Sequence, residues 1–127
     1  PGERLRVLVA EDNPVNALLA RVALEKAGHA VDVVNDGRAA TDRICAEAPY
    51  DAVLMDMHMP VMDGLDAIAL IRAHEEEAGA PGVPILVLTA DGLEETRSAA
   101  LARGANGVLT KPLDPDALVA AVESLAA

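Results

Sequence analysis

The sequence predicts an α/β fold in which helices cover both faces of a parallel β-sheet. Short runs of aliphatic and β-branched residues alternate with segments of helical pattern along the whole chain. Such regular alternation is typical of a parallel sheet buried between two helical layers. The chain has 127 residues, 52% of them hydrophobic, which suits one domain with a substantial core. We therefore expect residues 1–127 to form a single domain.

The predicted strands are the short apolar runs, of which the first is LRVLVA. Such runs are rich in Val, Leu and Ile, and β-branched residues are favoured in strands. The third run, AVLM, is followed by a charged residue, Asp56, which is costly to bury unless another group pairs with it. In chain order, the predicted strands cover residues 5–10, 30–34, 51–55, 85–88 and 108–109.

The predicted helices lie between these strands and have typical boundary residues. Asn13 and Pro14 are a typical N-cap and first helical residue, and Asp114 is expected to cap the last helix. Gly28 and Gly104 are expected to end the first and fourth helices. The second helix begins at residue 36 or 37 and is broken by residues 49–50. In chain order, the predicted helices cover residues 15–27, 37–47, 64–77, 93–103 and 115–125.

The order of the strands decides where a ligand would bind. Five strands with right-handed crossovers fit a flavodoxin-like, doubly wound sheet of order 2-1-3-4-5. Ligands of such sheets bind beyond the carboxyl ends of the strands, where the first and third strands diverge. The residues at these ends are Glu11, Asp12, Asp56, Thr89 and Lys111. We therefore expect three carboxylates, a hydroxyl and an ammonium group to converge at one edge of the sheet.

Three neighbouring carboxylates indicate a cation site. At about 5 Å and an effective dielectric near 20, each pair of carboxylates costs roughly 3 kcal/mol, and one lysine offsets only part of that. A divalent cation would offset the rest, and hard oxygen ligands suit Mg2+ best. Mg2+ in proteins commonly binds one or two carboxylates together with a phosphate oxygen. Because a carboxylate can attack phosphorus to give an acyl phosphate, the site is also suited to phosphoryl transfer.

The composition excludes several other classes of protein. The formal net charge of -11 argues against nucleic acid and anionic membranes as general partners, since both favour basic surfaces. The core must be aliphatic, because the chain has no Phe, no Trp and one Tyr. The single cysteine, Cys45, is expected to be a small buried side chain in a reducing, cytoplasmic compartment. No apolar run approaches the ~20 residues of a membrane span.

The chain resembles the receiver domain of bacterial two-component response regulators. The runs that carry this resemblance are VLVAEDNPVN, DAVLMDMHMPVMDG, ILVLTA and TKP, which occur in the family's order and spacing over nearly the whole chain. The resemblance implies that Asp56 accepts a phosphoryl group from a phosphohistidine. It also implies that Mg2+ is bound by Glu11, Asp12, Asp56 and the backbone carbonyl of His58. Such a domain catalyses its own phosphorylation and dephosphorylation.

The resemblance also implies roles for residues of the fourth and fifth strands. Thr89 and the Ala90 amide would bond the phosphoryl oxygens, and Lys111 would pair first with Asp56 and then with the phosphate. The Lys111–Pro112 peptide bond resembles the cis bond of the family. Receivers usually carry Tyr or Phe three residues before this lysine, whereas this chain has Val108. We therefore expect a small conformational response to phosphorylation.

The expected partner is a histidine kinase or a histidine phosphotransfer domain, and the domain is expected to be a monomer. The runs EDNPVN and MDMHMPVMDG most resemble receivers fused to hybrid sensor histidine kinases. Because the chain begins at Pro1 rather than Met, we expect it to be a piece of a longer protein, whose parent could be a membrane-anchored kinase. A free single-domain response regulator is the first alternative.

An alternative of another class is a phosphatase or nucleotide-binding domain on the same fold. Phosphatases with an aspartyl nucleophile carry a second Asp two residues after the first, but that position is His58. The chain also lacks the glycine-rich motifs G-x-x-x-x-G-K-[ST] and G-x-G-x-x-G. A purely structural interaction domain would take up no phosphoryl group.

Overall fold

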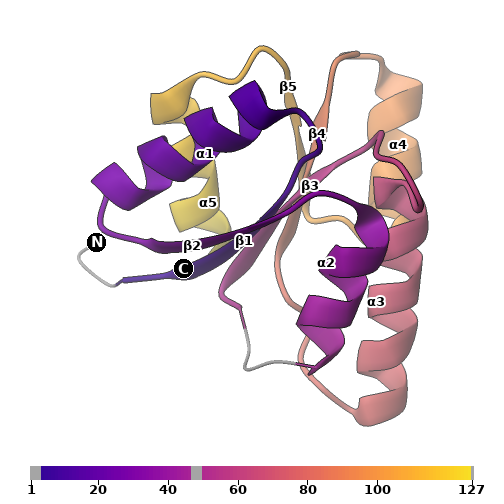
Figure 1. Ribbon diagram of the computed structural model, residues 1–127. Coiled ribbons are helices and arrows are strands. Elements are labelled where there is room, and N and C mark those ends of the chain that lie inside the picture. The colour runs from indigo at the N-terminus through magenta and orange to yellow at the C-terminus, as the bar shows by residue number, and fades with distance from the viewer. Residues whose placement is uncertain (1–3, 47–49, 127) are drawn as a thin grey trace.

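Five parallel strands form the centre of the molecule. A computed structural model describes residues 4–46 and 50–126, and the strands lie in the predicted order β2-β1-β3-β4-β5 (Figure 1). Their bounds are β1 Arg6–Ala10, β2 Ala30–Val34, β3 Ala52–Asp56, β4 Ile85–Thr89 and β5 Gly107–Thr110. In the parallel register, Ala10 of β1 lies beside Met55 of β3, so the residues that follow these two strands emerge side by side.

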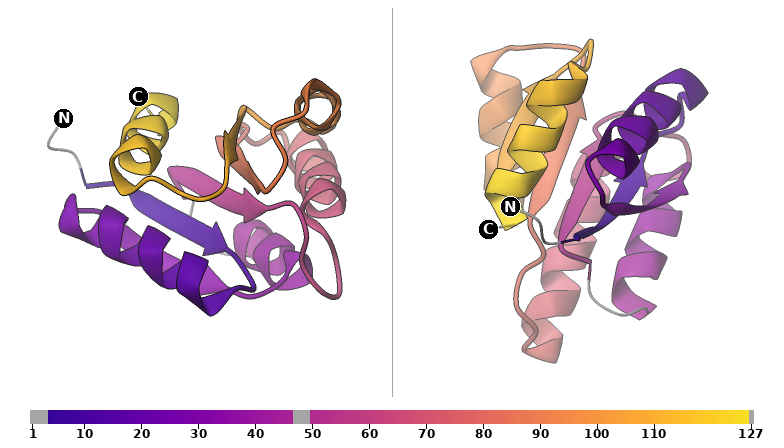
Figure 2. Two further views of the ribbon diagram at one scale, coloured as in Figure 1. Left: turned by 90° about the horizontal axis from the view of Figure 1, so that it is seen from above. Right: turned by 90° about the vertical axis from the view of Figure 1, so that its left-hand side faces the viewer.

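The helices form one layer on each face of the sheet. Their bounds are α1 Pro14–Lys26, α2 Gly37–Ala46, α3 Gly64–Ala78, α4 Glu94–Arg103 and α5 Pro115–Ala126. The right-hand view of Figure 2 shows α1 and α5 in front of the sheet and α2, α3 and α4 behind it. Among the described residues, none of these helices is long and apolar enough to cross a bilayer.

Each face of the sheet has its own aliphatic core. Leu8, Met55 and Val87 point into the core under α2 and α3. Their neighbours along the strands point the other way, into the core under α1 and α5, where Leu24 and Leu118 are fully buried. This two-sided burial explains why the strand sequences are apolar almost throughout. Tyr50, the single aromatic residue, is also buried.

The predicted helix boundaries agree with the structure to within one residue where the structure describes them. Asn13 caps α1 by accepting hydrogen bonds at its side-chain oxygen from the amides of Val15 (2.9 Å) and Asn16 (3.2 Å). Gly104 ends α4 in the left-handed conformation, with φ of 112°. The Asp114 side chain accepts from the first turn of α5. The predicted end of α2 at residue 47 and the break at residue 49 lie outside the described residues.

Three strands extend one residue further at their carboxyl ends than predicted, and all three added residues are polar. β3 includes Asp56, β4 includes Thr89 and β5 includes Thr110. Backbone pairing continues through these positions, because the Met57 amide donates to the Leu88 carbonyl (2.9 Å) and the Lys111 amide to the Thr89 carbonyl (2.7 Å). The sheet ladder therefore holds the backbone of these polar residues rigidly at the carboxyl edge.

Candidate functional site

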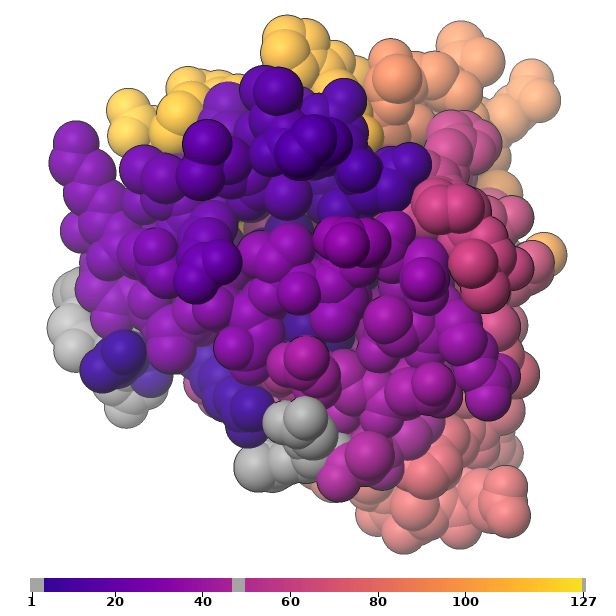
Figure 3. All heavy atoms as spheres, in the orientation of Figure 1, coloured from indigo at the N-terminus to yellow at the C-terminus, as the bar shows by residue number. Residues whose placement is uncertain are grey.

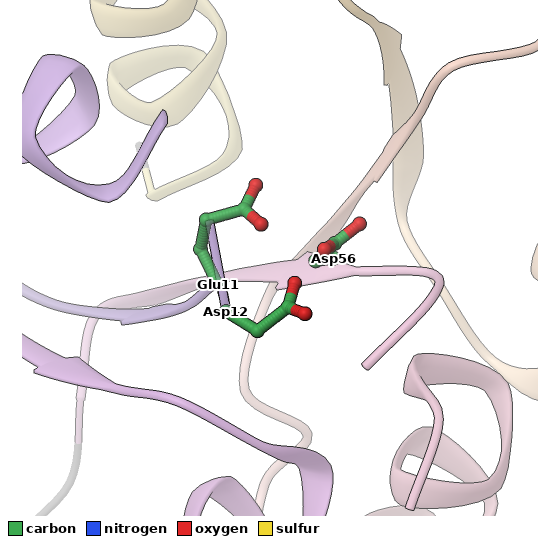
Figure 4. A group of neighbouring side chains, drawn as sticks. All are labelled: Glu11, Asp12 and Asp56. Atoms are coloured by element: carbon green, nitrogen blue, oxygen red, sulfur yellow. The ribbon is translucent and has the colours of Figure 1, made fainter. Parts of the chain in front are cut away.

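Three carboxylates converge at the carboxyl edge of the sheet, as predicted. Glu11 and Asp12 follow β1, and Asp56 is the last residue of β3 (Figure 4). One carboxylate oxygen from each residue lies within 4.8 Å of the others. Glu11 and Asp56 are buried, with 1% and 4% of their surface exposed, whereas Asp12 is exposed to solvent. The cluster is therefore open to water at Asp12, whereas Glu11 and Asp56 are shielded from it.

The glycine that begins α3 allows the chain to turn tightly around Asp56. A Cβ atom at Gly64 would overlap the Asp56 carbonyl oxygen, so only glycine fits without movement of the backbone. The Gly64 amide also donates to the Met57 carbonyl (2.9 Å). The two ends of the loop between β3 and α3 are thus joined next to the Asp56 backbone.

Lys111 is the one cation that the structure places in contact with this cluster, among the described residues. Its Nζ lies 3.1 Å from Asp56 Oδ1 and 2.9 Å from Glu11 Oε1. Burial acts to lower the pKa of Lys111, but the contacts with the two carboxylates outweigh it, and the pKa is raised overall. Lys111 therefore stays charged. The sequence predicted its pairing with Asp56, whereas the contact with Glu11 was not foreseen.

Glu11 has the most perturbed environment in the cluster. Its pKa is raised to about 7, first because burial disfavours the charged form and then because of the neighbouring Asp56. Oε2 accepts a hydrogen bond from the Asn13 amide (3.2 Å). Oε1 is buried and, within the described part of the chain, accepts no well-directed hydrogen bond. Its close contact among these residues is the Lys111 ammonium at 2.9 Å, and this oxygen can still accept a metal ion or a bound proton as a further partner.

The remaining predicted site residues line the same edge. Thr89 is 2% exposed, and its Oγ1 accepts from the Asp91 amide (3.2 Å). Ala90 is exposed directly after the strand. The His58 amide donates to Asp56 Oδ1 at 3.4 Å, while the His58 side chain is exposed. The Lys111–Pro112 peptide bond is cis, as the resemblance implied.

Asp91, also near this edge, holds the start of α4. Its Oδ1 accepts from the Leu93 amide (2.8 Å), and its Oδ2 accepts from the Thr96 hydroxyl (2.9 Å). Leu93 itself offers no side-chain cap, and Asp91 instead holds the N-cap amide and the hydroxyl of a first-turn residue. The backbone of Asp91 is in turn bonded to Thr89, so the start of α4 is linked to the site.

The loop after β3 contains strain that the sequence did not reveal. Val61 has φ of 68°, a left-handed conformation that is rare for a β-branched residue. The Met62 amide donates to the Pro60 carbonyl (2.7 Å), which closes a γ-turn around Val61. Val61 is also 81% exposed. Pro60 marks a turn in the sequence, but nothing in the sequence shows that a valine would occupy its strained centre.

The comparisons with known proteins agree with this site. Residues 7–123 match the response regulator receiver domain family. The chain is 43% identical over 108 residues to the sensor protein GacS of Pseudomonas syringae, covering 85% of this chain and 12% of that protein. It is 38% identical over 120 residues to hybrid signal transduction histidine kinase M of Dictyostelium discoideum, covering 94% of this chain and 5% of that protein. The chain thus spans only a small part of these relatives.

Solved structures show the same architecture. The receiver domain of sensor histidine kinase PA1611 from Pseudomonas aeruginosa, with a magnesium ion coordinated in its active-site cleft, has a TM-score of 0.85 at 35% identity and 98% coverage of both chains. The receiver domain of Ssk1 from Saccharomyces cerevisiae, in complex with the phosphotransfer protein Ypd1, has a TM-score of 0.90 at 30% identity, covering 97% of this chain and 89% of that one. The chain belongs to the response regulator receiver domain family.

Proposed function

We propose that Asp56 of this receiver domain accepts a phosphoryl group from a phosphohistidine in a two-component phosphorelay that depends on Mg2+. The observation that carries this proposal is the convergence of Glu11, Asp12 and Asp56, with Lys111 in contact with Glu11 and Asp56. An acceptor carboxylate needs a neighbouring cation to approach an anionic phosphoryl donor. The half-buried Lys111 ammonium supplies one such charge at a fixed position.

The residues present fit a magnesium ion. Glu11, Asp12 and Asp56 offer hard oxygen ligands, and Glu11 Oε1 is a buried acceptor without a well-directed hydrogen bond. With the His58 carbonyl, these groups would hold the ion and leave room for water and a phosphoryl oxygen. When bound, Mg2+ would offset the repulsion between the acids and the charge on the transferring phosphoryl oxygens. The magnesium in the Pseudomonas aeruginosa receiver supports this assignment.

The chemistry of the acceptor follows from its surroundings. An Asp56 carboxylate oxygen forms a bond to phosphorus as the bond between phosphorus and the histidine nitrogen of the donor breaks, and the imidazole leaves with the electron pair. Lys111 is placed to follow the negative charge from the carboxylate to the phosphoryl oxygens. The Thr89 hydroxyl and the Ala90 amide, at the end of β4, would donate to those oxygens. Hydrolysis of the resulting acyl phosphate would end the signal.

The donor is proposed to be a histidine kinase or a histidine phosphotransfer domain. The relatives named above include hybrid histidine kinases, and the Ssk1 receiver was solved with the phosphotransfer protein Ypd1. We further propose that the domain is a monomer in the cytoplasm of a bacterial cell and is part of a longer kinase chain. A stand-alone regulator would share the same chemistry at Asp56.

Intact-mass analysis tests the proposed acceptor. In Mg2+ with acetyl phosphate as a small phosphodonor, the wild-type domain should gain one phosphoryl group, and the gain should disappear in EDTA. The Asp56→Asn variant should not be labelled. A matched Asp66→Asn variant, at an exposed carboxylate on α3, should be labelled like wild type. Equal labelling of Asp56→Asn would contradict the assignment, and turnover of a phosphomonoester would favour the phosphatase alternative.

A further inference from the structure

All four methionines of the chain lie within eight residues around the proposed acceptor. They are Met55, Met57, Met59 and Met62, in the run MDMHMPVM. Met55 is in β3, and the other three follow Asp56 in the loop to α3. In Figure 3, this stretch reaches the surface beside α2, where its dark pink spheres adjoin the purple of that helix. The thioether groups of the chain are therefore concentrated at the site itself.

The structure divides these methionines into two pairs. Met55 is fully buried and Met57 is 7% exposed, and both lie in the core under α2 and α3. Met59 and Met62 are half-buried and pack only against the margin of that core. The side chains of Met59 and Met62 are therefore more accessible to an oxidant in solution than those of Met55 and Met57, which are shielded.

Met62 is a contact point between the loop and α2. Its carbonyl accepts from the Gly37 amide (3.0 Å), and its Sδ lies 3.9 Å from the Thr41 hydroxyl. A Cβ atom at Gly37 would overlap the Met62 carbonyl oxygen, so the two backbones are in close contact. The Thr41 hydroxyl already donates to the Gly37 carbonyl (2.8 Å). A strongly polar group on Met62 would therefore lie beside a Thr41 hydroxyl that already donates its hydrogen to Gly37.

We propose that Met59 and Met62 form a modification site for hydroperoxides and that their oxidation slows phosphoryl uptake at Asp56. In each reaction the thioether sulfur attacks the terminal peroxide oxygen, the O–O bond breaks, and a sulfoxide and an alcohol (water from hydrogen peroxide) are formed. The sulfur loses two electrons to the peroxide. The product is polar and chiral where the thioether was apolar and flexible.

The effect on the acceptor follows from the closure of the loop. The loop that carries the two methionines ends at Gly64, where a Cβ atom would overlap the Asp56 carbonyl oxygen and where the amide donates to the Met57 carbonyl. A displacement of the loop therefore moves the backbone around Asp56, and the His58 amide that contacts its carboxylate moves as well. This part of the inference rests on the proposed function of Asp56, whereas the selective oxidation does not.

Cys45 is the competing target for a peroxide, and it lies elsewhere. It is half-buried rather than buried as predicted, and it lines a cavity of about 460 Å³ between α2 and the loop before β4. Burial is the main cause that raises the pKa of its thiol, so little of the reactive thiolate is present near neutral pH. A Cys45→Ala background removes this competition altogether.

The experiment treats the Cys45→Ala protein with limiting hydrogen peroxide and maps sulfoxides by peptide mass spectrometry. Met59 and Met62 should gain oxygen first, at least about ten times faster than Met55 and Met57. The initial rate of labelling by acetyl phosphate in Mg2+ should then fall by between about 5-fold and about 100-fold, since a misplacement of about 1 Å can cost 100-fold in a positioned reaction. Reduction by methionine sulfoxide reductases should restore it.

Two variants serve as matched controls, since a change from Met to Leu nearly conserves volume. The Met59→Leu/Met62→Leu protein should be labelled like the untreated parent and should keep that rate after peroxide. The Met57→Leu protein should remain peroxide-sensitive. Oxidation of all four methionines at one rate, or an unchanged labelling rate with Met59 and Met62 oxidised, would overturn the proposal. If the untreated protein takes up no phosphoryl group, the proposed function fails instead, and the oxidation map still tests the selective site.

Discussion

The two edges of the β-sheet treat charge in opposite ways. At the carboxyl edge, three carboxylates share one ammonium group, and a buried Glu11 oxygen accepts no well-directed hydrogen bond from the described residues. At the amino edge, polar groups are matched. Arg72 donates to the Gly104 carbonyl (3.0 and 2.9 Å), to Asn106 Oδ1 (3.0 Å) and to Glu75 Oε1 (2.7 Å). Glu75 in turn accepts from the Val83 amide (2.8 Å).

His29 shows the same matching at the amino edge. Its Nδ1 accepts from the Leu5 amide (3.1 Å), so the proton of the neutral ring is on Nε2, which donates to Glu123 Oε2 (2.8 Å). One buried ring thereby joins the start of β1 to α5. The amino edge thus stabilises the fold, whereas the carboxyl edge retains repulsion between carboxylates. Under the proposed function, a bound cation would offset this repulsion.

The largest predicted effect on stability is at the amino edge. Arg72→Ala removes the partner of Glu75 and the donors to Gly104, so the free energy of unfolding should fall by about 2–3 kcal/mol. Arg103→Ala is the matched control, because its ion pair with Asp66 is exposed and should contribute less than about 0.5 kcal/mol. Urea unfolding of both variants measures the difference. An equal fall in the free energy of unfolding of both variants would show that the Arg72 contacts stabilise the fold no more than an exposed ion pair does.

The second prediction concerns pH at the carboxyl edge. The pKa of Glu11 is raised to about 7 in the folded protein, above the ordinary value of 4.5, so the folded state binds the extra proton between these values. The free energy of unfolding of the metal-free domain should therefore fall as pH rises from about 5 to 8. The expected fall is on the order of 1 kcal/mol, because water screens part of the interaction.

The Glu11→Gln variant provides the control for this pH dependence. It cannot release the proton, so the part of the slope due to Glu11 should vanish in urea melts carried out in EDTA. Mg2+ should bind the wild-type domain more tightly as pH rises through 7, because the ligand must be deprotonated. A metal-free domain that becomes more stable between pH 5 and 8 would contradict the assignment of the raised pKa.

The third prediction concerns the strained turn. A left-handed, non-glycine residue costs about 1–3 kcal/mol, and glycine avoids this cost. Glycine also has more conformational freedom in the unfolded chain, which offsets about 0.5–1 kcal/mol of the gain. Val61→Gly should therefore stabilise the domain by about 1 kcal/mol. Val61→Ala, which keeps a Cβ atom, should gain less. Thermal unfolding in EDTA decides the order, and a loss of stability in Val61→Gly would mean that the turn is not strained.

The smallest predicted effect is the response of β5 and α4 to phosphorylation. Val108 is half-buried against the core and, being β-branched, has a stiff side chain that cannot swing between surface and interior as a ring does. Beryllofluoride with Mg2+, a mimic of the phosphoryl group, should shift amide signals near Asp56, Thr89 and Lys111 and change those of α4 only weakly. Large shifts throughout α4 and α5, or dimer formation seen by light scattering, would contradict this expectation.

Most of the fold, and the edge of the sheet where the candidate site lies, could be inferred from the sequence because they depend on local signals. Hydrophobic periodicity and caps located the strands and helices, and the parallel topology then brought Glu11 and Asp56 to one edge. The extension of β3 through Asp56 could not be inferred, because a charged residue normally ends an apolar run. Its pairing with Lys111, 55 positions later in the chain, makes that position tolerable.

The contacts that the sequence did not reveal are those between distant side chains. Arg72 and Gly104 are 32 positions apart, and His29 and Glu123 are 94 positions apart. Neither pair has a spacing that distinguishes it from exposed surface residues. In the run Glu75 to Glu77, Glu75 is buried and contacts Arg72, whereas the next two residues are exposed. Only the folded arrangement shows which members of a polar run are buried.

The stability of Asp56→Asn without metal tests the central claim of this account most directly. Removing one of the repelling carboxylates should raise the free energy of unfolding in EDTA by about 1–3 kcal/mol, even though Lys111 loses one contact and keeps Glu11. Mg2+ at ten times its dissociation constant should add about 1.4 kcal/mol to the wild type and less to the variant. Urea melts of both proteins, in EDTA and in Mg2+, give all four values. A wild-type domain that is as stable as Asp56→Asn in EDTA, or more stable, would contradict the claim that the carboxyl edge retains unfavourable charge for its function.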